Sequence, residues 1–258
     1  MEVKDREDKD IRQPDLKSMN MEELRNWVTG AGQPAFRAKQ IYQWFHVKLA
    51  DGTEEMTNLP KSLREKMDEY GIYGVSVVTR LISEDDGTNK FLFRLHDGNV
   101  IESVLMKYKH GNSVCISSQV GCRMGCRFCA STIGGLVRNL TASEMLSQIY
   151  SIQKITGERV SNVVVMGTGE PLDNFDNVVK FLRLVNHPEG LNIGYRHISL
   201  STCGVVPKIY ELASLNLPIT LSVSLHAPFN DLRSEIMPIN KKYPLETLTA
   251  AMTHYIQK

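Results

Sequence analysis

Residues 121–131 read GCRMGCRFCAS, and this stretch carries the strongest signal in the chain. It places Cys122, Cys126 and Cys129 at the spacing C-x3-C-x2-C. Cysteines clustered in this way are typical of metal or redox sites, because buried structural cysteines need not be neighbours in sequence. Arg123 and Arg127 favour the thiolate forms that bind metal. Three thiolates on a four-iron cluster leave one iron without a protein ligand, and that iron can bind a substrate or cofactor.

Two other interpretations of the cysteines remain open. One is a zinc site completed by Cys115 or a histidine, and the other is a thioredoxin-like pair formed by Cys126 and Cys129. Zinc sites usually present two separated pairs of cysteines, and a thioredoxin-like pair has no need of Cys122. The spacing therefore favours the cluster with an open iron.

Around this stretch, short apolar runs alternate with helical patterns. We predict strands over residues 113–118, 162–166, 197–201 and 219–224, each followed by a helix. The first of these helices begins with a capping box formed by Thr141 and Glu144. Alternating strands and helices predict parallel strands with right-handed crossovers, here a partial (βα) barrel of four units. The cysteines then follow the first strand, at the end of the barrel where catalytic residues gather.

The residues before this region follow two other patterns. Up to residue 75 the apolar side chains recur at helical spacing, and residues 76–110 hold three apolar runs separated by Asp-Gly dipeptides that suit hairpin turns. We therefore predict an α/β protein with a helical domain over residues 1–75, an antiparallel meander of three strands over 76–110 and the partial (βα) barrel over 111–258.

Further motifs stand at the ends of the later predicted strands. The run GTGEP, residues 167–171, places bare glycine backbone beside Glu170, a combination that suits an α-amino group. Ser201 ends the third strand, and Ser224, Leu225 and His226 end the fourth. Each motif alone is commonly a turn or a helix cap, but parallel strands bring these residues to the same mouth as the cysteines.

Together these stretches resemble the radical S-adenosylmethionine (SAM) superfamily and, within it, the RlmN-type methyltransferases, which methylate carbon 2 of an adenosine in 23S ribosomal RNA and transfer RNA. The runs PAFRAKQIYQWFH, GGLVRNLTASE and GLNIGYRHISLST belong to the same resemblance. It implies that the three clustered cysteines hold a 4Fe-4S cluster and that the amino-terminal helices help to hold RNA. It also implies SAM contacts at Gly169, Glu170, Ser201, Ser224, Leu225 and His226.

Two further residues receive roles from the resemblance. Period-two alternation places Glu102 on one strand face with Val104 and Met106, where we expect desolvation to raise its pKa. The resemblance implies that Glu102 accepts a proton, whereas the pattern alone leaves a solvent-facing or ion-paired glutamate open. Cys115 alone reads as a buried strand residue. The resemblance implies that it releases the product by forming a disulfide with a second, methylated cysteine nearer the carboxyl end.

The chain departs from this family at its carboxyl end. No cysteine follows Cys203, which matches no family role and is expected in the core, and the chain stops at Lys258. Family members continue with further βα units and the cysteine that carries the methyl group. We therefore expect these 258 residues to be an incomplete form, competent at most for binding the cluster and SAM and unable to methylate RNA.

Composition sets the remaining expectations. With 30 basic and 29 acidic side chains the net charge is +1, so RNA binding would need a local patch. Five cysteines and the lack of a long apolar run indicate a cytoplasmic protein without a membrane segment, and we expect a monomer reduced by a donor such as a flavodoxin. The alternatives are another radical SAM enzyme and a non-enzymatic RNA-binding module with a structural zinc or iron-sulfur site. Candidate RNA contacts are Phe36, Arg37, Lys39, Tyr42, Trp44, Lys107, Lys109 and His110.

Overall fold

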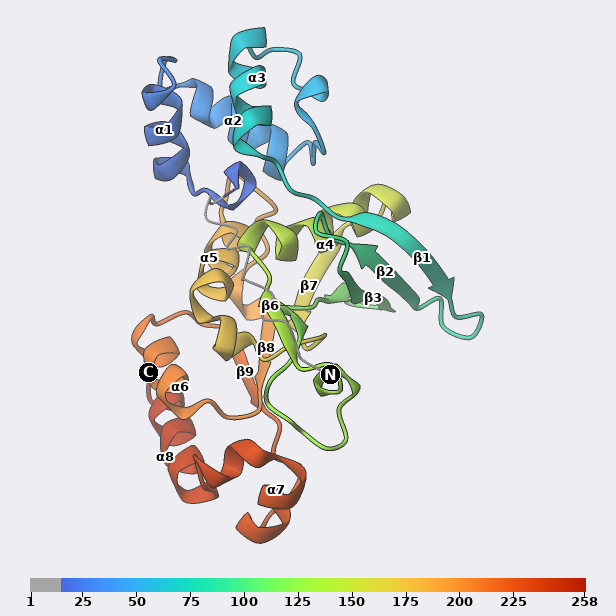
Figure 1. Cartoon of the computed structure of the whole chain (residues 1–258), viewed down its shortest axis with the longest axis vertical. Helices are drawn as coiled ribbons and strands as arrows, with labels where there is room; N and C mark the ends of the chain where they lie inside the picture. The colour runs from blue at the N-terminus through green and yellow to red at the C-terminus, as the bar shows by residue number, and fades with distance from the viewer. Residues whose placement is uncertain (1–14) are drawn as a thin grey trace, which may run out of the picture.

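A seven-stranded sheet organises residues 15–258, the part of the chain that the computed structural model describes (Figure 1). The strand order is β1-β2-β3-β4-β7-β8-β9. The pairs β1–β2, β2–β3 and β3–β4 are antiparallel, whereas the pairs β4–β7, β7–β8 and β8–β9 are parallel. The strands are β1 (Ser76–Ile82), β2 (Asn89–Arg94), β3 (Val100–Tyr108), β4 (Gly111–Cys115), β7 (Val160–Val165), β8 (Ile198–Thr202) and β9 (Thr220–Val223).

The α/β class and the four parallel strands are confirmed, and the strands lie within a few residues of their predicted bounds. The predicted meander, however, is not separate from the predicted barrel. Strand β3 pairs with β4 in antiparallel register, with Val104 opposite Cys115, so the sheet continues across residues 110 and 111. The division into three domains remains a prediction, because the second boundary falls within one sheet.

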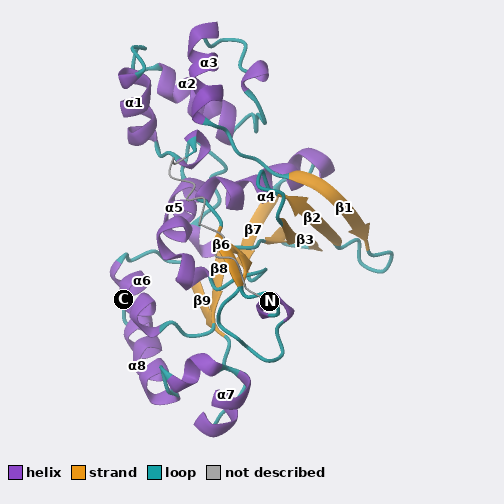
Figure 2. Ribbon diagram, viewed as in Figure 1, coloured by secondary structure: helices purple, strands orange, loops and turns teal. Residues whose placement is uncertain are grey.

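The parallel strands alternate with helices that cover one face of the sheet (Figure 2). Helix α4 begins at the predicted capping box, in which Thr141 Oγ1 accepts from the Glu144 amide and the Glu144 carboxylate accepts from the Thr141 amide. The helices that follow the sheet strands are α4 (Ala142–Thr156), α5 (Phe175–Asn186), α6 (Val206–Ser214), α7 (Asn230–Ile236) and α8 (Leu245–Ile256), with the 3-10 turns η4 (Pro171–Asn174), η5 (Tyr195–His197) and η6 (Pro238–Lys241).

The two faces of the parallel strands differ in their side chains. Paired residues of neighbouring strands share a face, and Val114, Val163 and Ile198 form a buried row that belongs to the core with α4 and α5. The next residue of each strand lies on the opposite face, where Cys115 and Ser199 are only partly buried. The core therefore lies on the helix side, and the other face is left for smaller and more polar side chains.

The amino-terminal region is helical, as its apolar spacing predicts. Helices α1 (Met21–Gly30), α2 (Arg37–His46) and α3 (Lys61–Tyr70), with the 3-10 turns η1 (Leu16–Ser18) and η2 (Thr53–Glu55), lie at the opposite end of the molecule from α7 (Figure 1). They contact the barrel through α4 and α5; for example, Lys180 Nζ lies 2.8 Å from the Glu23 carboxylate. Within residues 15–258, no helix has the length and apolar character needed to span a bilayer.

Candidate metal and cofactor site

The cysteines lie in a loop that is closed at its neck by a small hairpin. Strands β5 (Gln119–Gly121) and β6 (Leu136–Asn139) pair antiparallel on either side of the loop, which also contains η3 (Ala130–Thr132). Gly121 adopts a φ of 72°, and a Cβ there would lie 1.9 Å from the Gly135 carbonyl oxygen. That oxygen accepts a hydrogen bond from the Cys122 amide at 3.0 Å. Glycine is therefore required where the ends of the loop meet.

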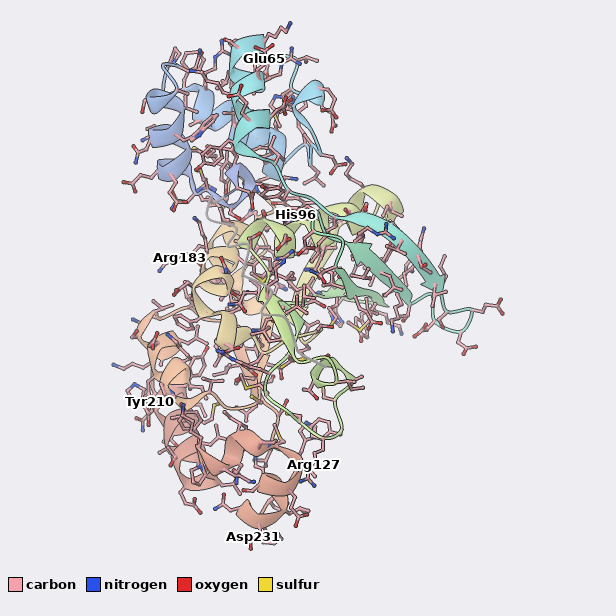
Figure 3. The ribbon with its side chains drawn as sticks, viewed as in Figure 1. Glu65, His96, Arg127, Arg183, Tyr210 and Asp231 are labelled. Atoms are coloured by element: carbon pink, nitrogen blue, oxygen red, sulfur yellow. The ribbon has the colours of Figure 1, made fainter. Side chains whose placement is uncertain are left out.

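The far side of this loop reaches helix α7. The Arg127 amide donates to the Ile236 carbonyl at 2.9 Å, and Figure 3 shows Arg127 beside α7, at the end of the molecule opposite Glu65. The loop is thus held both at its neck and at its turn.

All three clustered cysteines line one cavity of about 310 Å³. The loops after β7, β8 and β9 supply the rest of its wall, as the parallel topology predicts. Among the residues predicted to bind SAM, the cavity is lined by Gly169, Glu170, Ser201, Ser224 and His226.

Three thiolates around one cavity fit a four-iron cluster. Of the fourth zinc ligands considered above, Cys115 does not line the cavity, whereas a histidine, His226, does. A four-iron cluster is larger than one ion, so thiolates arranged around a cavity suit it.

Burial controls the protonation of the cysteine thiols in the absence of metal. Desolvation, followed by the charge of the neighbouring thiols, raises the pKa of Cys126 to about 11, and desolvation also raises the pKa of Cys122. Asp173 and, to a smaller extent, the charge of Cys122 raise the pKa of Arg123, so the expected attraction between Arg123 and a thiolate is present, but burial has the larger effect on the cysteine pKa values. Arg123 is bound to Asp173 at 2.5 Å, and both arginine side chains are exposed. Metal binding must therefore displace protons from the cysteines.

Gly169 and Glu170 hold the turn after β7 against its neighbours. Gly169 has a φ of 109°, and a Cβ there would lie 2.8 Å from the Gln119 amide nitrogen. The Glu170 carboxylate is buried and accepts hydrogen bonds from Thr202 Oγ1 and the Cys203 amide, both at 2.7 Å, and from the Leu172 amide. Burial raises the pKa of Glu170, and the hydrogen bonds partly oppose this effect. This carboxylate joins the ends of β7 and β8 and retains only part of its acceptor capacity for a ligand.

The residues after β8 and β9 complete the cavity with hydroxyl groups and a ring. The Oγ atoms of Ser201 and Ser224 lie 3.4 Å apart. His226 has a left-handed φ of 58°, and its ring centroid lies 4.4 Å from that of Phe128 in the cysteine loop. The Leu225 side chain is exposed and does not line the cavity, so only its backbone could contact a ligand there.

Comparisons with known proteins place these features in a family. Residues 14–72 match the family described as ribosomal RNA large subunit methyltransferase N-terminal domain, and residues 116–257 match the radical SAM superfamily. A probable dual-specificity RNA methyltransferase RlmN of Lachnospira eligens is 59% identical over 244 residues, which cover 94% of this chain and 70% of the relative. The chain belongs to the RlmN family.

Other RlmN relatives and a solved structure agree with this assignment. The protein of the same name from Geobacillus kaustophilus is 52% identical over 249 residues, 95% of this chain and 68% of the relative. A crystal structure of a radical SAM methyltransferase from Sphaerobacter thermophilus matches with a TM-score of 0.88 and 40% identity, covering 94% of this chain and 72% of that one. The chain thus spans about 70% of the length of the RlmN protein of L. eligens.

Glu102 occupies a different environment from the one that its alternation pattern suggested. It shares a face with Val104, as expected, but its side chain is 48% exposed and lies 2.7 Å from Lys90 Nζ. The predicted desolvation is wrong, because this face of β3 is not covered by other described residues. Neither Glu102 nor Cys115 lines the cavity, although both lie on the same face of the sheet.

Cys115 and Glu102 are nevertheless connected to the cavity wall by short paths. Burial raises the pKa of the Cys115 thiol, and the backbone of Met166, a residue that lines the cavity, lowers it to a smaller extent. Ser117 Oγ donates to the Glu102 carbonyl at 2.7 Å and accepts from the Thr168 amide of the GTGEP turn at 3.0 Å.

Several cavity residues were not found from the sequence. Phe128 lies between two of the cysteines and could have been inferred from that position, whereas Met237 follows α7 with no local signal. Cys203 is buried, as expected, but it also lines the cavity and packs with Cys126 and Met237. The other lining residues that we did not predict are Met124, Thr132, Val165, Met166 and Thr202.

Proposed function

We propose that this chain binds a 4Fe-4S cluster through Cys122, Cys126 and Cys129 and binds SAM in the adjoining cavity. We further propose that these sites serve methylation of carbon 2 of an adenosine in 23S ribosomal RNA and transfer RNA, the reaction that membership of the RlmN family implies. The observation that carries the proposal is one cavity lined both by the three cysteines and by the loops after three parallel strands.

Different residues of the cavity suit different parts of the SAM molecule. When bound, a cluster with an open iron supplies one electron beside the sulfonium of SAM. Backbone oxygens near Gly169 and the remaining acceptor capacity of Glu170 suit the ammonium group of the methionine part. The hydroxyls of Ser201 and Ser224 suit a carboxylate or a ribose, and the rings of Phe128 and His226 suit an adenine face.

The amino-terminal helices supply the proposed RNA contacts. Phe36 is exposed and carries the Arg37 guanidinium 4.9 Å from its ring centroid, and Lys48 Nζ lies 3.5 Å from the Trp44 ring centroid. Such cation and aromatic pairs suit phosphate binding and base stacking. Tyr42, which we had also considered, is wholly buried and cannot stack on a base.

Other candidate RNA contacts are already engaged in ion pairs. Lys39 binds Glu189 and Lys107 binds Glu158, both at 2.5 Å. These lysines would have to exchange a carboxylate for a phosphate. A flavodoxin-type donor, a monomeric state and a cytoplasmic location remain predictions from the sequence.

The proposal is tested by anaerobic reconstitution with iron and sulfide. We expect about four irons per chain and an EPR signal of the reduced cluster that changes when SAM is added. Cys126→Ser should lose the iron, whereas Cys115→Ser should retain it, because Cys115 lies outside the cavity. Colourless protein with stoichiometric zinc would instead favour the structural metal site, and a cluster indifferent to SAM would contradict the proposed cofactor.

A further inference from the structure

Arg233, in helix α7, is the largest fully buried side chain of the described residues, with 0% of its surface exposed. Its guanidinium donates four hydrogen bonds. Nε binds the Leu225 carbonyl at 3.1 Å, one terminal nitrogen binds the carbonyls of Cys203 at 2.8 Å and Ser224 at 3.2 Å, and the other binds Asn240 Oδ1 at 2.8 Å. Four of the five N–H groups of the buried guanidinium are thus hydrogen-bonded.

Two of these acceptors, Cys203 and Ser224, belong to residues that line the cavity, and the third, Leu225, follows Ser224 directly. Cys203 follows β8, and Ser224 and Leu225 follow β9, so one guanidinium joins the ends of two neighbouring strands. The next residue, His226, has the unfavourable φ of 58° and turns its ring toward Phe128. Arg233 therefore fixes the backbone that presents Ser224 and His226 to the cavity.

The charge of Arg233 has no carboxylate partner among residues 15–258, since all four acceptors are neutral. The carboxylates of its own helix, Asp231 and Glu235, are exposed, and Figure 3 shows Asp231 at the outer tip of α7. A buried charge is costly unless an opposite charge compensates it.

The cysteines of the site lie next to this charge. One terminal nitrogen of Arg233 donates to the Cys203 carbonyl at 2.8 Å. Cys203 also packs directly against Cys126 and Met237. The missing opposite charge thus lies on the side of the cysteines, where three thiolates would carry it once a cluster is bound.

We propose that Arg233 is a positioning residue that holds the ends of β8 and β9 and also supplies the positive charge that compensates the thiolate-bound cluster, thereby raising its reduction potential. The inference rests on the proposed cluster. A nearby cation in a low-dielectric interior favours the reduced, more negative state of the cluster. The neutral hydrogen-bond partners of Arg233 leave its full charge available for this effect.

The test is a redox titration of reconstituted protein followed by EPR, with SAM affinity measured in parallel. Arg233→Met should lower the midpoint potential and weaken SAM binding by roughly tenfold or more, the effect of losing hydrogen bonds from a charged group. Arg233→Lys should weaken SAM binding while keeping the potential close to that of the wild type. The matched control is Lys241→Met, which removes an exposed cation one residue after Asn240 and should change neither quantity, because water screens its charge.

A second variant separates charge from folding. Asn240→Asp retains an acceptor for Arg233 and adds the missing carboxylate, but it removes the amide that donates to Asn230 and Ser234. Circular dichroism first establishes that this variant folds, and the folded variant should have a lower potential than the wild type. An unchanged potential in Asn240→Asp or in fully loaded Arg233→Met would overturn the electrostatic role, and unchanged SAM affinity in both Arg233 variants would overturn the positioning role. Wild-type protein that takes up no iron would overturn the proposed function and this inference with it. Loaded wild-type protein whose variants all match it would overturn the inference alone.

Discussion

The backbone and the side chain of Glu170 make hydrogen bonds to different elements of the cavity wall. Its carboxylate faces the end of β8 and accepts from Thr202, Cys203 and Leu172, while its amide donates to Gln119 Oε1 at 2.8 Å. One residue thus connects β5, β7 and β8 below the proposed SAM site. This arrangement requires an acceptor with two oxygens, because three donors converge on it.

Glu170→Gln should destabilise the protein for that reason. The amide has one acceptor oxygen, and its NH2 group would face backbone and hydroxyl donors, so we expect a loss of about 1–3 kcal/mol in the free energy of unfolding. Urea denaturation of the metal-free protein measures this loss. The control is Glu158→Gln, which removes a solvent-exposed ion pair with Lys107 and should change the free energy of unfolding much less. Equal effects of the two substitutions would contradict the role given to Glu170.

Among single residues, the sequence identified the three cysteines and five of the proposed SAM contacts in the cavity, but it misjudged Glu102. The spacing of the cysteines and the positions of Ser201 and Ser224 at strand ends follow from local patterns and parallel topology, and these residues do meet. Alternation correctly placed Glu102 and Val104 on one face. It carries no information on whether that face is covered, which depends on packing between distant segments.

Among the elements, the hairpin of β5 and β6 controls the shape of the cysteine loop. The neck requires Gly121, where both the left-handed φ and the contact with the Gly135 carbonyl exclude a side chain. The loop can present its cysteines to one cavity only while this neck remains closed.

Gly121→Ala should therefore open or strain the loop. We expect a loss of about 1–3 kcal/mol from the backbone conformation alone, together with lower iron uptake on reconstitution. Thermal unfolding and iron analysis provide the two measurements. Gly134→Ala is the matched control in the same loop, since a Cβ there meets nothing within 4 Å and its φ is not positive. If both variants take up iron like the wild type, the neck is not needed for the site.

This hairpin was not predicted, although the strands and helices around it were. Strands of three and four residues are too short for a periodic pattern to reveal. The capping box of α4, by contrast, is a local motif and appears where Thr141 and Glu144 place it. A motif that lies within one helical turn, such as the capping box, can be recognised in the sequence. The pairing of two short strands on either side of the cysteine loop cannot.

For the whole molecule, a buried contact joins the amino-terminal helices to the barrel. His46, the last residue of α2, lies with Nδ1 2.6 Å from the Tyr150 hydroxyl of α4, and its ring is buried. Burial, the charge of nearby Lys17 and then His187 lower the pKa of His46 to about 3. His46 is therefore neutral in the folded protein near neutral pH.

This lowered pKa predicts a pH dependence of stability. The unfolded chain binds a proton on His46 below its ordinary pKa of about 6.5, whereas the folded chain does so only near 3. The contribution of His46 to the free energy of unfolding should therefore be fully present above about pH 6.5 and be lost as the pH falls toward 3. Urea denaturation across this range measures the slope, and His46→Gln should flatten it. His110→Gln, at an exposed position, should leave the slope as in the wild type, and a variant at position 46 with the wild-type slope would contradict the assignment.

The sequence predicted the helical, hairpin and alternating regions of the molecule, but not that the hairpin strands and the parallel strands form one sheet. Helical spacing, hairpin turns and alternating strands each identified their own region. The pairing of β3 with β4 joins two of these regions, and it depends on hydrogen bonds that leave no mark in local composition.

That shared sheet holds Glu102 and Cys115 in a different way from the groups proposed to bind SAM. Glu102 and Cys115 project from adjacent hydrogen-bonded strands, so the regular geometry of the sheet fixes the distance between them. The groups proposed to hold SAM stand on loops, where backbone torsions can adapt as a ligand enters. Filling or emptying the cavity should consequently shift the adaptable groups against a fixed pair, rather than alter the geometry within that pair.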